Sequence, residues 1–274
     1  MKSRSHPRRH FWLTTVLLAG LAQAAPHEAR VPGGLAQVTL GPTSEPRPTA
    51  RFDDRPVLVH REGPRWVAWV GLPLDLAPGT HPLRVSDGAG ERDVALQVRA
   101  KAYPVQHLRV KNRRMVNPNP DDLARIRKEA DTQTEIKTLF RDEAGPSLDF
   151  IAPAQGRRSS AFGLRRTFNG EPRAPHRGLD IAAGRGAPVV APAGGVVTHV
   201  GDFFFNGRTV FLDHGQGLIT MVCHLERVDV KAGERIAQGA ALGRVGSTGR
   251  ATGPHLHWSV FLNGTPVDPA LFLD

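Results

Sequence analysis

Four histidines and one aspartate in the C-terminal part of the chain are the residues best suited to chemistry. They occupy three short segments: His176-Arg177-Gly178-Leu179-Asp180, Cys223-His224-Leu225 and His255-Leu256-His257. Two imidazoles and one carboxylate can hold a zinc ion and leave its fourth position open to water, which is typical of catalytic rather than structural sites. Such an ion acidifies water and polarises a carbonyl oxygen, so this set predicts hydrolysis.

The spacing of these residues predicts their roles. Residues two apart on a strand project from the same face, so one imidazole of the pair His255 and His257 can bind metal while the other reaches the bound water. His176 and Asp180 supply the remaining ligands, and spacing leaves open which of the other two touches the metal. His224, from a different segment, can hydrogen-bond the developing oxyanion. Each pattern occurs often by accident, and only their joint occurrence favours a metal site.

The elements that must position these residues are strands. Glycine and proline separate short β-branched runs from Phe150 onward, and Asn263-Gly264 is a hairpin turn signal. Short apolar runs also alternate with turn signals over Arg51–Arg99, after a first strand near Gly34–Leu40, which predicts a small antiparallel sandwich. The predicted fold class is mainly β: an amino-terminal β sandwich, a linking helix, and a carboxy-terminal antiparallel β domain with an open metal cleft.

One helix is predicted between the two β regions, over about residues 120–141. Asn119 can cap it, Pro120 suits its first position, and the next two aspartates favour the positive end of the helix dipole. The pattern predicts that one apolar stripe packs on the protein. Its members are Leu123, Ile126, Ala130, Ile136, Leu139 and Phe140.

Residues 1–24 have the composition of a secretory signal peptide. Four basic residues precede an apolar run, Phe11–Leu21, and the small residues Ala22-Gln23-Ala24. The run is shorter than the ~20 residues that span a bilayer, so cleavage and no stable membrane span are expected, with an uncleaved anchor as the alternative. The expected domains are then the sandwich at 26–105, the linker at 106–148 and the site-bearing domain at 149–274.

Charge and cysteine content bound the partners and the compartment. The formal charge is +10, and loss of the four basic residues of the signal segment would leave +6. A cationic exported protein is attracted to anionic polymers such as the cell wall, whereas the pattern of a nucleic-acid reader is missing. The single cysteine, Cys223, excludes an intrachain disulfide. We expect a monomer in the periplasm or cell envelope that binds no nucleic acid.

Several residues near the site allow more than one interpretation. Neighbours on an extended strand diverge, so Cys223 and His224 are not expected to form a nucleophilic pair. His214 is expected to fix a turn through hydrogen bonds rather than to bind metal. Arg165 and Arg166 are either a solvated pair or ligands of substrate carboxylates.

A set of short motifs spans residues 150–274. They are Phe162-Gly163 with Arg165-Arg166, Pro175-His176-Arg177-Gly178-Leu179-Asp180-Ile181, Ala191-Pro192 with Gly194-Gly195-Val196-Val197, Asp213-His214-Gly215, His224-Leu225, and Gly246-Ser247-Thr248-Gly249 leading into Gly253-Pro254-His255-Leu256-His257. This combination resembles the lysostaphin-type zinc endopeptidases that cut peptidoglycan cross-links. Residues 31–140 more loosely resemble the amino-terminal module and connecting helix of exported family members from Gram-negative bacteria.

The resemblance implies a site and a reaction. It implies one Zn2+ per chain, ligated by His176, Asp180 and His257, with His255 and His224 serving water activation and transition-state stabilisation. The implied substrate is the peptide bridge between peptidoglycan stems, at the D-alanyl to diaminopimelate bond in a Gram-negative cell. Many relatives carry Tyr two residues before the His-Leu histidine, where this chain has another residue, so an auxiliary phenol contact is in doubt.

Two alternatives to this function remain. One is a catalytically silent wall-binding protein that activates a separate amidase, and the other is a metal-dependent hydrolase of a non-wall peptide. Silent relatives typically lack one or more ligands, whereas all five positions are present here. This favours an enzyme.

Overall fold

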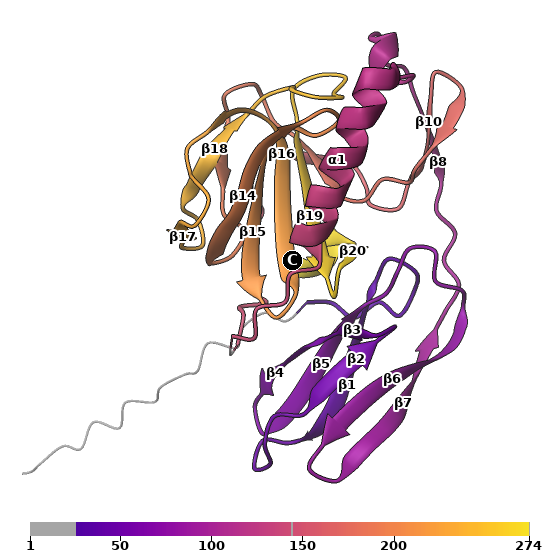
Figure 1. The fold of residues 1–274 in the computed structure, drawn as a ribbon, viewed down its shortest axis with the longest axis vertical. Helices are drawn as coiled ribbons and strands as arrows, with labels where there is room; N and C mark the ends of the chain where they lie inside the picture. The colour runs from indigo at the N-terminus through magenta and orange to yellow at the C-terminus, as the bar shows by residue number, and fades with distance from the viewer. Residues whose placement is uncertain (1–25, 144, 274) are drawn as a thin grey trace, which may run out of the picture.

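The structure, a computed structural model, describes residues 26–143 and 145–273. The predicted signal peptide lies outside this range. Two β regions and one long helix make up the described chain, with the helix lying in front of the larger sheet (Figure 1). Within the described residues, no helix is both long and apolar enough to cross a membrane. The predicted fold class, mainly β with one linking helix, is confirmed.

The amino-terminal region is an antiparallel sandwich of two sheets. Buried residues alternate with exposed ones along its outer strands, as Leu83 and Val85 do with the exposed Arg84. The two inner faces therefore share one apolar core. One sheet has the order β1 (Leu35–Pro42), β5 (Arg65–Gly71), β4 (Leu58–Glu62), and the other β3 (Arg55–Pro56), β2 (Thr49–Phe52), β6 (Gly79–Asp87), β7 (Gly90–Val98).

The carboxy-terminal region is built on one large antiparallel sheet. Its main order is β17 (Arg235–Ile236), β14 (Gly195–Phe203), β15 (Gly207–Gly215), β16 (Leu218–Val228), β19 (Leu256–Leu262), β12 (Leu179–Ala182), β9 (Arg157–Ser160). Three short strands extend it: β13 (Pro188–Val190) pairs with β18 (Ala241–Val245), β18 also with β16, and β20 (Thr265–Val267) with β19. The turn predicted at Asn263-Gly264 joins β19 to β20, with φ of 44° and 72°.

The two faces of this sheet are buried against different partners. Val210, Leu212 and Val222 point into the larger core, which is closed by the 3-10 helix η2 (Pro269–Phe272) and the segment before β9. Their neighbours along the strands, including Phe211, Met221 and Cys223, point to the opposite face, where they meet Ile136 of the long helix. The strand period of two thus produces two separate apolar layers.

The linker contributes a strand of its own. β8 (Val105–Leu108) pairs in parallel with β10 (Arg165–Phe168), which pairs with β11 (Glu171–Arg173). Asn169 fixes the end of this small sheet, since its side-chain amide accepts from the backbone N–H of Val110 and donates to the carbonyl of the same residue. The linker then runs through the short 3-10 helix η1 (Arg113–Met115) to the long helix. Residues from the linker therefore reach the edge of the carboxy-terminal domain.

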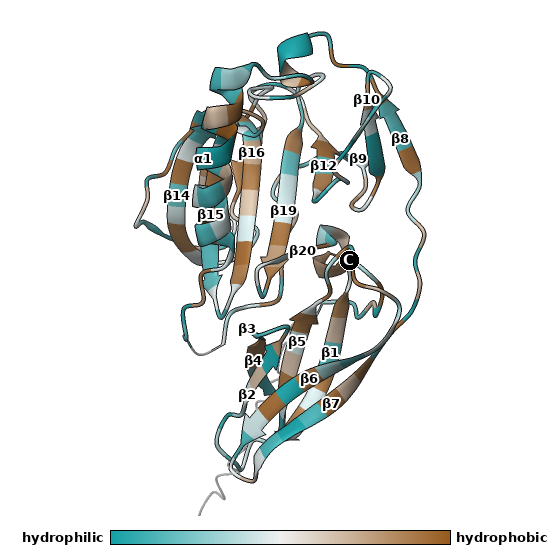
Figure 2. Ribbon diagram, turned by 45° about the vertical axis from the view of Figure 1, so that its right-hand side comes forward, coloured by the Kyte–Doolittle hydropathy of each residue, from teal (hydrophilic) through white to brown (hydrophobic). Residues whose placement is uncertain are grey.

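The long helix α1 (Pro120–Lys137) begins as predicted. The Asn119 side chain accepts from the Asp122 N–H at 2.8 Å, and Asp122 accepts from the Asn119 N–H at 3.3 Å, a reciprocal cap. The helix ends at Lys137 rather than at about residue 141. Figure 2 shows it largely in the hydrophilic colour.

The predicted apolar stripe of α1 is wrong in its first half. Leu123 is 42% exposed, and within the helix Ile136 alone of the stripe is buried. The early turns are instead attached by polar contacts: the Arg125 guanidinium donates to the Asp202 carbonyl, and the Glu129 carboxylate accepts from the Phe204 N–H at 2.7 Å. Only the last turns pack on the apolar face of the sheet, where Ile136 meets Phe211 and Met221.

Two buried amides dock the sandwich onto the large sheet. Gln216, in the β15–β16 turn, accepts from the Val59 N–H at 2.9 Å and donates to the Glu143 carbonyl. Asn263 accepts from the Gly71 N–H at 2.7 Å and donates back to the Gly71 carbonyl at 3.2 Å. Leu35, Leu58, Val67 and Trp69 of the sandwich belong to the same apolar core as the large sheet. The two regions are therefore packed together, while the predicted boundaries at residues 105 and 149 stay predictions.

Candidate metal centre

Two strands and the segment before one of them bring the candidate ligands together. Asp180 on β12 lies directly opposite His257 on β19 in the antiparallel register, and His176 precedes β12 by three residues. His176 is only 2% exposed and Asp180 only 8%. Their ligand atoms and that of His257 form the one group of three or more His, Cys, Asp or Glu side chains within metal-binding distance among the described residues.

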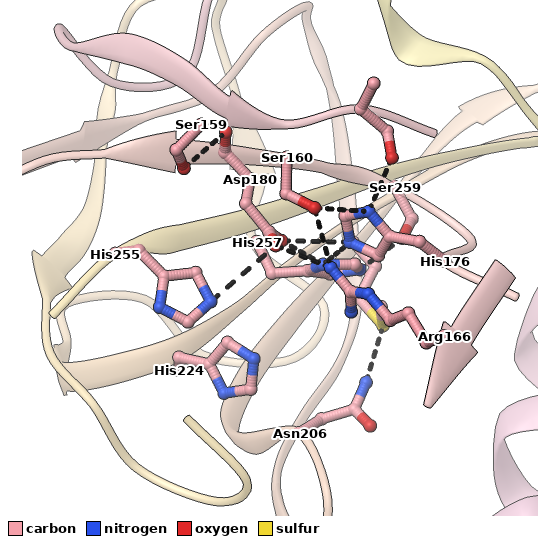
Figure 3. A network of polar contacts seen from close by, with 12 residues as sticks. Ser159, Ser160, Arg166, His176, Asp180, Asn206, His224, His255, His257 and Ser259 are labelled. Atoms are coloured by element: carbon pink, nitrogen blue, oxygen red, sulfur yellow. Dashed lines mark hydrogen bonds and ion pairs between the residues drawn. The ribbon is translucent and has the colours of Figure 1, made fainter. Parts of the chain in front are cut away.

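The donor atoms of this group converge closely (Figure 3). His176 Nε2 lies 3.0 Å from Asp180 Oδ1 and 3.0 Å from His257 Nδ1, and the last two atoms are 2.8 Å apart. Zinc binds such nitrogen and oxygen atoms at about 2.0–2.2 Å, so three atoms this close together can share one ion.

The hydrogen bond on the far side of His176 tests whether a cation fits. Its Nδ1 lies 2.8 Å from the Ala161 carbonyl oxygen, which can only accept, so Nδ1 carries the proton of the neutral ring. Nε2 then presents a lone pair to the Asp180 carboxylate at 3.0 Å. Two acceptors face each other at hydrogen-bond distance, an arrangement that a metal cation between them would stabilise.

The ionisation of Asp180 and His257 also suits a metal site. Burial opposes charge on Asp180, yet the imidazoles of His176 and His257 hold the pKa of its carboxyl far below the usual range. Burial lowers the pKa of His257 to about 4 against the opposing effect of Asp180. The set at neutral pH is therefore one carboxylate with a neutral His257 ring, and metal ligands must be deprotonated in this way.

A second layer of side chains holds the ligands in place. The Arg166 guanidinium donates to Asp180 Oδ2 at 2.9 Å and to Ser160 Oγ at 2.9 Å, and its Nε donates to Gln106 of β8 at 3.0 Å. Ser259 Oγ lies 2.9 Å from His257 Nε2. Outer contacts of this kind orient metal ligands and adjust their basicity.

His255 and His224 stand beside the metal group with matching orientations. His255 Nδ1 lies 2.9 Å from the Gly253 carbonyl, and His224 Nδ1 lies 2.8 Å from the Thr248 carbonyl. Each neutral ring therefore carries its proton on Nδ1 and a lone pair on Nε2. The ring centroids are 4.7 Å apart, and His255 Nε2 is 3.9 Å from Asp180 Oδ1. Burial lowers the pKa of His224 to about 3.

His224 reaches the site through an irregular backbone. Its φ is +63°, and the pairing of β15 with β16 shifts register at this point. The expectation about Cys223 and His224 assumed a regular strand, which does not hold at His224; both residues line one cavity, and the absence of a nucleophilic pair stays a prediction. Burial nevertheless raises the pKa of the Cys223 thiol well above its usual value, so this thiol stays protonated.

The remaining sequence candidates have structural contacts. His214 Nδ1 donates to the Gly194 carbonyl (2.7 Å), and in the neutral ring its Nε2 accepts from Thr220 Oγ1 (2.8 Å), as expected for a residue that fixes a turn. Arg165 is exposed, whereas Arg166 binds Asp180. Neither interpretation of the Arg165-Arg166 pair named this contact with Asp180, and nothing in the sequence singled out Ser160, Ser259 or Gln106.

Two cavities adjoin the metal group. The helix-side cavity, about 450 Å³, extends between α1 and the sheet, and the linker-side cavity, about 310 Å³, extends toward β8. They have five lining residues in common: Arg166, Phe168, His224, Arg250 and His257. A substrate that occupied both cavities would therefore pass the metal group.

Two family models and a solved structure to which this chain is similar all concern the same peptidase family. Residues 174–269 match peptidase family M23, and residues 28–101 match the peptidase family M23 N-terminal domain. A solved structure from Pseudomonas aeruginosa, named as peptidase M23, is 43% identical with a TM-score of 0.75 and covers 89% of this chain and 95% of its own.

Two curated relatives are similar over shorter stretches. The peptidoglycan DD-endopeptidase ShyC of Vibrio cholerae is 43% identical over 113 residues, which are 40% of this chain and 26% of the relative. The DD-carboxypeptidase/endopeptidase Mpg of Neisseria meningitidis is 44% identical over 94 residues, 34% of this chain and 22% of the relative. The matches thus span about a quarter of the length of these relatives.

Proposed function

The chain belongs to peptidase family M23, as its motifs indicated, and from that premise we propose that it is a zinc-dependent endopeptidase that hydrolyses peptide cross-links of peptidoglycan. The observation that carries the proposal is the convergence of His176 Nε2, Asp180 Oδ1 and His257 Nδ1 within 3.0 Å of one another. These three atoms would hold one zinc ion. When bound, zinc acidifies a water molecule and polarises the carbonyl oxygen of a peptide bond.

The residues beside the metal group would move the protons. His255 has a lone pair on Nε2 on the side of the ligands, because its Nδ1 proton is held by the Gly253 carbonyl. We assign His255 as the general base that takes a proton from the attacking water and returns it to the leaving amine. The handover needs no large movement, since the same nitrogen serves both steps.

His224 is assigned as the partner of the oxyanion. Its Nδ1 proton is committed to the Thr248 carbonyl, so Nε2 donates a hydrogen bond only when the ring is doubly protonated. Negative charge that develops on the substrate oxygen would favour that cationic form, although burial disfavours it beforehand. The role of His224 thus depends on charge that appears during the reaction.

The substrate and compartment follow from the family and the leader segment. Relatives named as DD-endopeptidases support the D-alanyl to diaminopimelate bond as the scissile bond. The signal-like residues 1–24 and the basic charge of the chain support export to the periplasm or cell envelope, with peptidoglycan stems as partners. We propose a monomer that binds no nucleic acid.

The silent-activator alternative is disfavoured by the same atoms. A protein without catalysis has no need for a converged ligand set with two further imidazoles beside it. A hydrolase of non-wall peptides remains the competing enzyme, and substrate distinguishes it.

Digestion of defined cross-linked muropeptides tests the proposal. Purified protein loaded with zinc should split the dimer into two stems, identified by mass, and a chelator should stop the reaction until zinc is restored. An activator would release no product by itself, and a non-wall hydrolase would leave sacculi intact while cutting a free glycine-rich peptide.

The variant His255→Ala tests the assigned base. It should retain stoichiometric zinc and lose roughly 100- to 10,000-fold in kcat, the usual contribution of a positioned general base. Unchanged cleavage by a zinc-loaded His255→Ala protein would overturn the assignment.

A further inference from the structure

Arg250 has an unusual position for a charged residue. It lies in the loop between β18 and β19, and its guanidinium carbon is 4.5 Å from the ring centroid of Phe168 and 4.1 Å from that of Phe205. The cation thus lies over two aromatic rings, which attract it through their π faces. A guanidinium over an aromatic ring keeps N–H groups that can donate to other partners.

The loop that carries Arg250 is fixed by close backbone packing. Gly249 has φ of +68°, and a Cβ there would lie 2.4 Å from the Gly207 nitrogen and 2.5 Å from the Phe205 oxygen. The Arg250 N–H then donates to that same Phe205 oxygen at 2.8 Å. Because the backbone is held on the β14–β15 turn, the guanidinium is presented in a defined place without a bound ligand.

Arg250 is also the uncompensated member of a cluster of three guanidiniums. Arg166 is paired with Asp180 at 2.9 Å and Arg173 with Glu171 at 2.6 Å. Among the described residues, neither a carboxylate nor a carbonyl oxygen accepts a hydrogen bond from the Arg250 side chain. Burial, followed by the nearby Arg166 and Arg173, lowers its pKa to about 10, so the group remains charged at neutral pH.

The location of this unpaired cation indicates what it binds. Arg250 lines both the helix-side and the linker-side cavity, together with His224 and His257. A peptide that crosses the metal group from one cavity to the other would pass the Arg250 side chain. Guanidinium N–H groups bind carboxylates through paired, charge-assisted hydrogen bonds.

We propose that Arg250 binds a free carboxylate of the peptide stem next to the scissile bond and thereby selects the substrate, an inference that rests on the proposed function. Peptide stems carry such groups on the diaminopimelate residue and on the terminal D-alanine. Both sources offer the same chemistry to Arg250. The proposal makes Arg250 a specificity-determining residue, distinct from the zinc ligands and from His255.

Three synthetic dimers test the proposal: one with all carboxylates free, one amidated at the diaminopimelate carboxylate beside the scissile bond, and one amidated at the terminal D-alanine. Wild-type protein should cleave one of the amidated dimers about 10- to 100-fold less efficiently than the free dimer, the range expected for a lost charge-assisted contact. That dimer identifies the source of the carboxylate. Equal kcat/KM for all three would overturn the proposal.

Arg250→Gln should remove this preference. On the free dimer, the kcat/KM of Arg250→Gln should fall to the value that wild type has on the poorly cleaved amidated dimer. On that amidated dimer, the kcat/KM of Arg250→Gln should equal that of wild type. Arg250→Lys, which keeps the charge without the paired donors, should retain part of the preference. Arg185→Gln is the matched control. Arg185 is exposed, binds Glu226 of β16 and Ser247 of the loop that carries Arg250, and lines neither cavity, so the preference of this variant should equal that of wild type.

A binding measurement separates this proposal from the proposed function. Fluorescence anisotropy of the labelled dimers is measured with the His255→Ala protein and with the double variant that carries both His255→Ala and Arg250→Gln. A preference for the free carboxylate that disappears with Arg250→Gln supports the proposal even if wild-type protein cleaves no dimer. An equal loss on free and amidated dimers would instead mean that Arg250 only clamps its loop, and would refute selection.

Discussion

The sandwich and the large sheet use the same strand period but differ in what they bury. In the described residues 26–105, no charged or hydrogen-bonding side chain is buried, apart from the indole of Trp69. The large-sheet region buries twelve polar or charged residues: Ser160, His176, Asp180, Thr209, Asp213, His214, Gln216, Thr220, His224, Ser259, Asn263 and Thr265. Burial of a polar group costs free energy unless it is hydrogen-bonded. The sandwich thus buries almost only apolar side chains, whereas the large sheet also buries polar and charged ones.

The buried polar groups of the large sheet have two separate roles. His176, Asp180, His224, Ser259 and Ser160 gather around the candidate metal centre. Gln216 and Asn263 instead occupy turns that dock the sandwich. Docking amides and candidate metal ligands are similarly buried, so burial of a polar group does not by itself indicate function. The partners of the group distinguish the two roles.

The largest expected effect comes from the candidate metal-binding carboxylate, compared with an exposed carboxylate of the sandwich. Asp180→Ala removes the only carboxylate of the metal group, and we expect zinc loss and a fall in kcat/KM on the order of 1,000-fold or more, as for residues that act as a unit. Zinc is measured by elemental analysis and cleavage by muropeptide digestion. Asp93→Ala removes an exposed carboxylate of the sandwich and should change neither quantity. Full zinc occupancy in Asp180→Ala would contradict the assigned ligand set.

The buried His214 should make the stability of the protein depend on pH. Burial lowers its pKa from 6.5 to about 4, so the unfolded chain takes up the proton first. The contribution of neutral His214 to the free energy of unfolding should therefore be complete above pH 6.5. It should fall as the pH drops toward 4 and stay constant below that pH. The loss is about 3 kcal/mol for a shift of this size. Urea titrations of wild type and His214→Asn across this window should show a difference that shrinks toward pH 4, and a constant difference would count against the assignment.

Arg166 and Arg165 allow a comparison of a partly buried and an exposed charge in their effect on zinc affinity. Arg166→Met removes the donor to Asp180 Oδ2, and zinc affinity should fall about 10- to 100-fold, the usual effect of an outer contact of a metal ligand. Arg165→Met removes an exposed charge and should leave affinity unchanged. Competition with a chromophoric chelator measures both. Equal effects would mean that charge alone, rather than the contact with Asp180, supports the site.

The smallest effect concerns docking. Gln216→Ala leaves the Val59 N–H and the Glu143 carbonyl without their partner, and the free energy of unfolding should fall by roughly 1–2 kcal/mol. Gln97→Ala, which removes an exposed side-chain contact within the sandwich, should cost much less. Urea unfolding of both variants gives the comparison. A cost for Gln97→Ala as large as that for Gln216→Ala would show that burial is not the deciding property.

Local signals in the sequence predicted much of the architecture. The alternating apolar runs, the cap at Asn119 with Pro120, and the Asn263-Gly264 turn each depend on neighbours in the chain, and the structure has the elements they predict. The stripe of α1 failed because periodicity reports only which residues share a face, and a polar attachment to the β14–β15 loop replaced apolar packing there.

The sequence by itself determined the chemical inventory of the site: five side chains of the right types, three of them expected as ligands. The tertiary structure alone decided their outer contacts, because Ser160, Ser259, Arg166 and Gln106 meet the ligands only through strand pairing and the return of the linker along β10. It also turned His224 toward the site through a positive φ, and left Arg250 without an acid. Contacts between distant segments depend on the packing of the whole chain, so no local pattern encodes them.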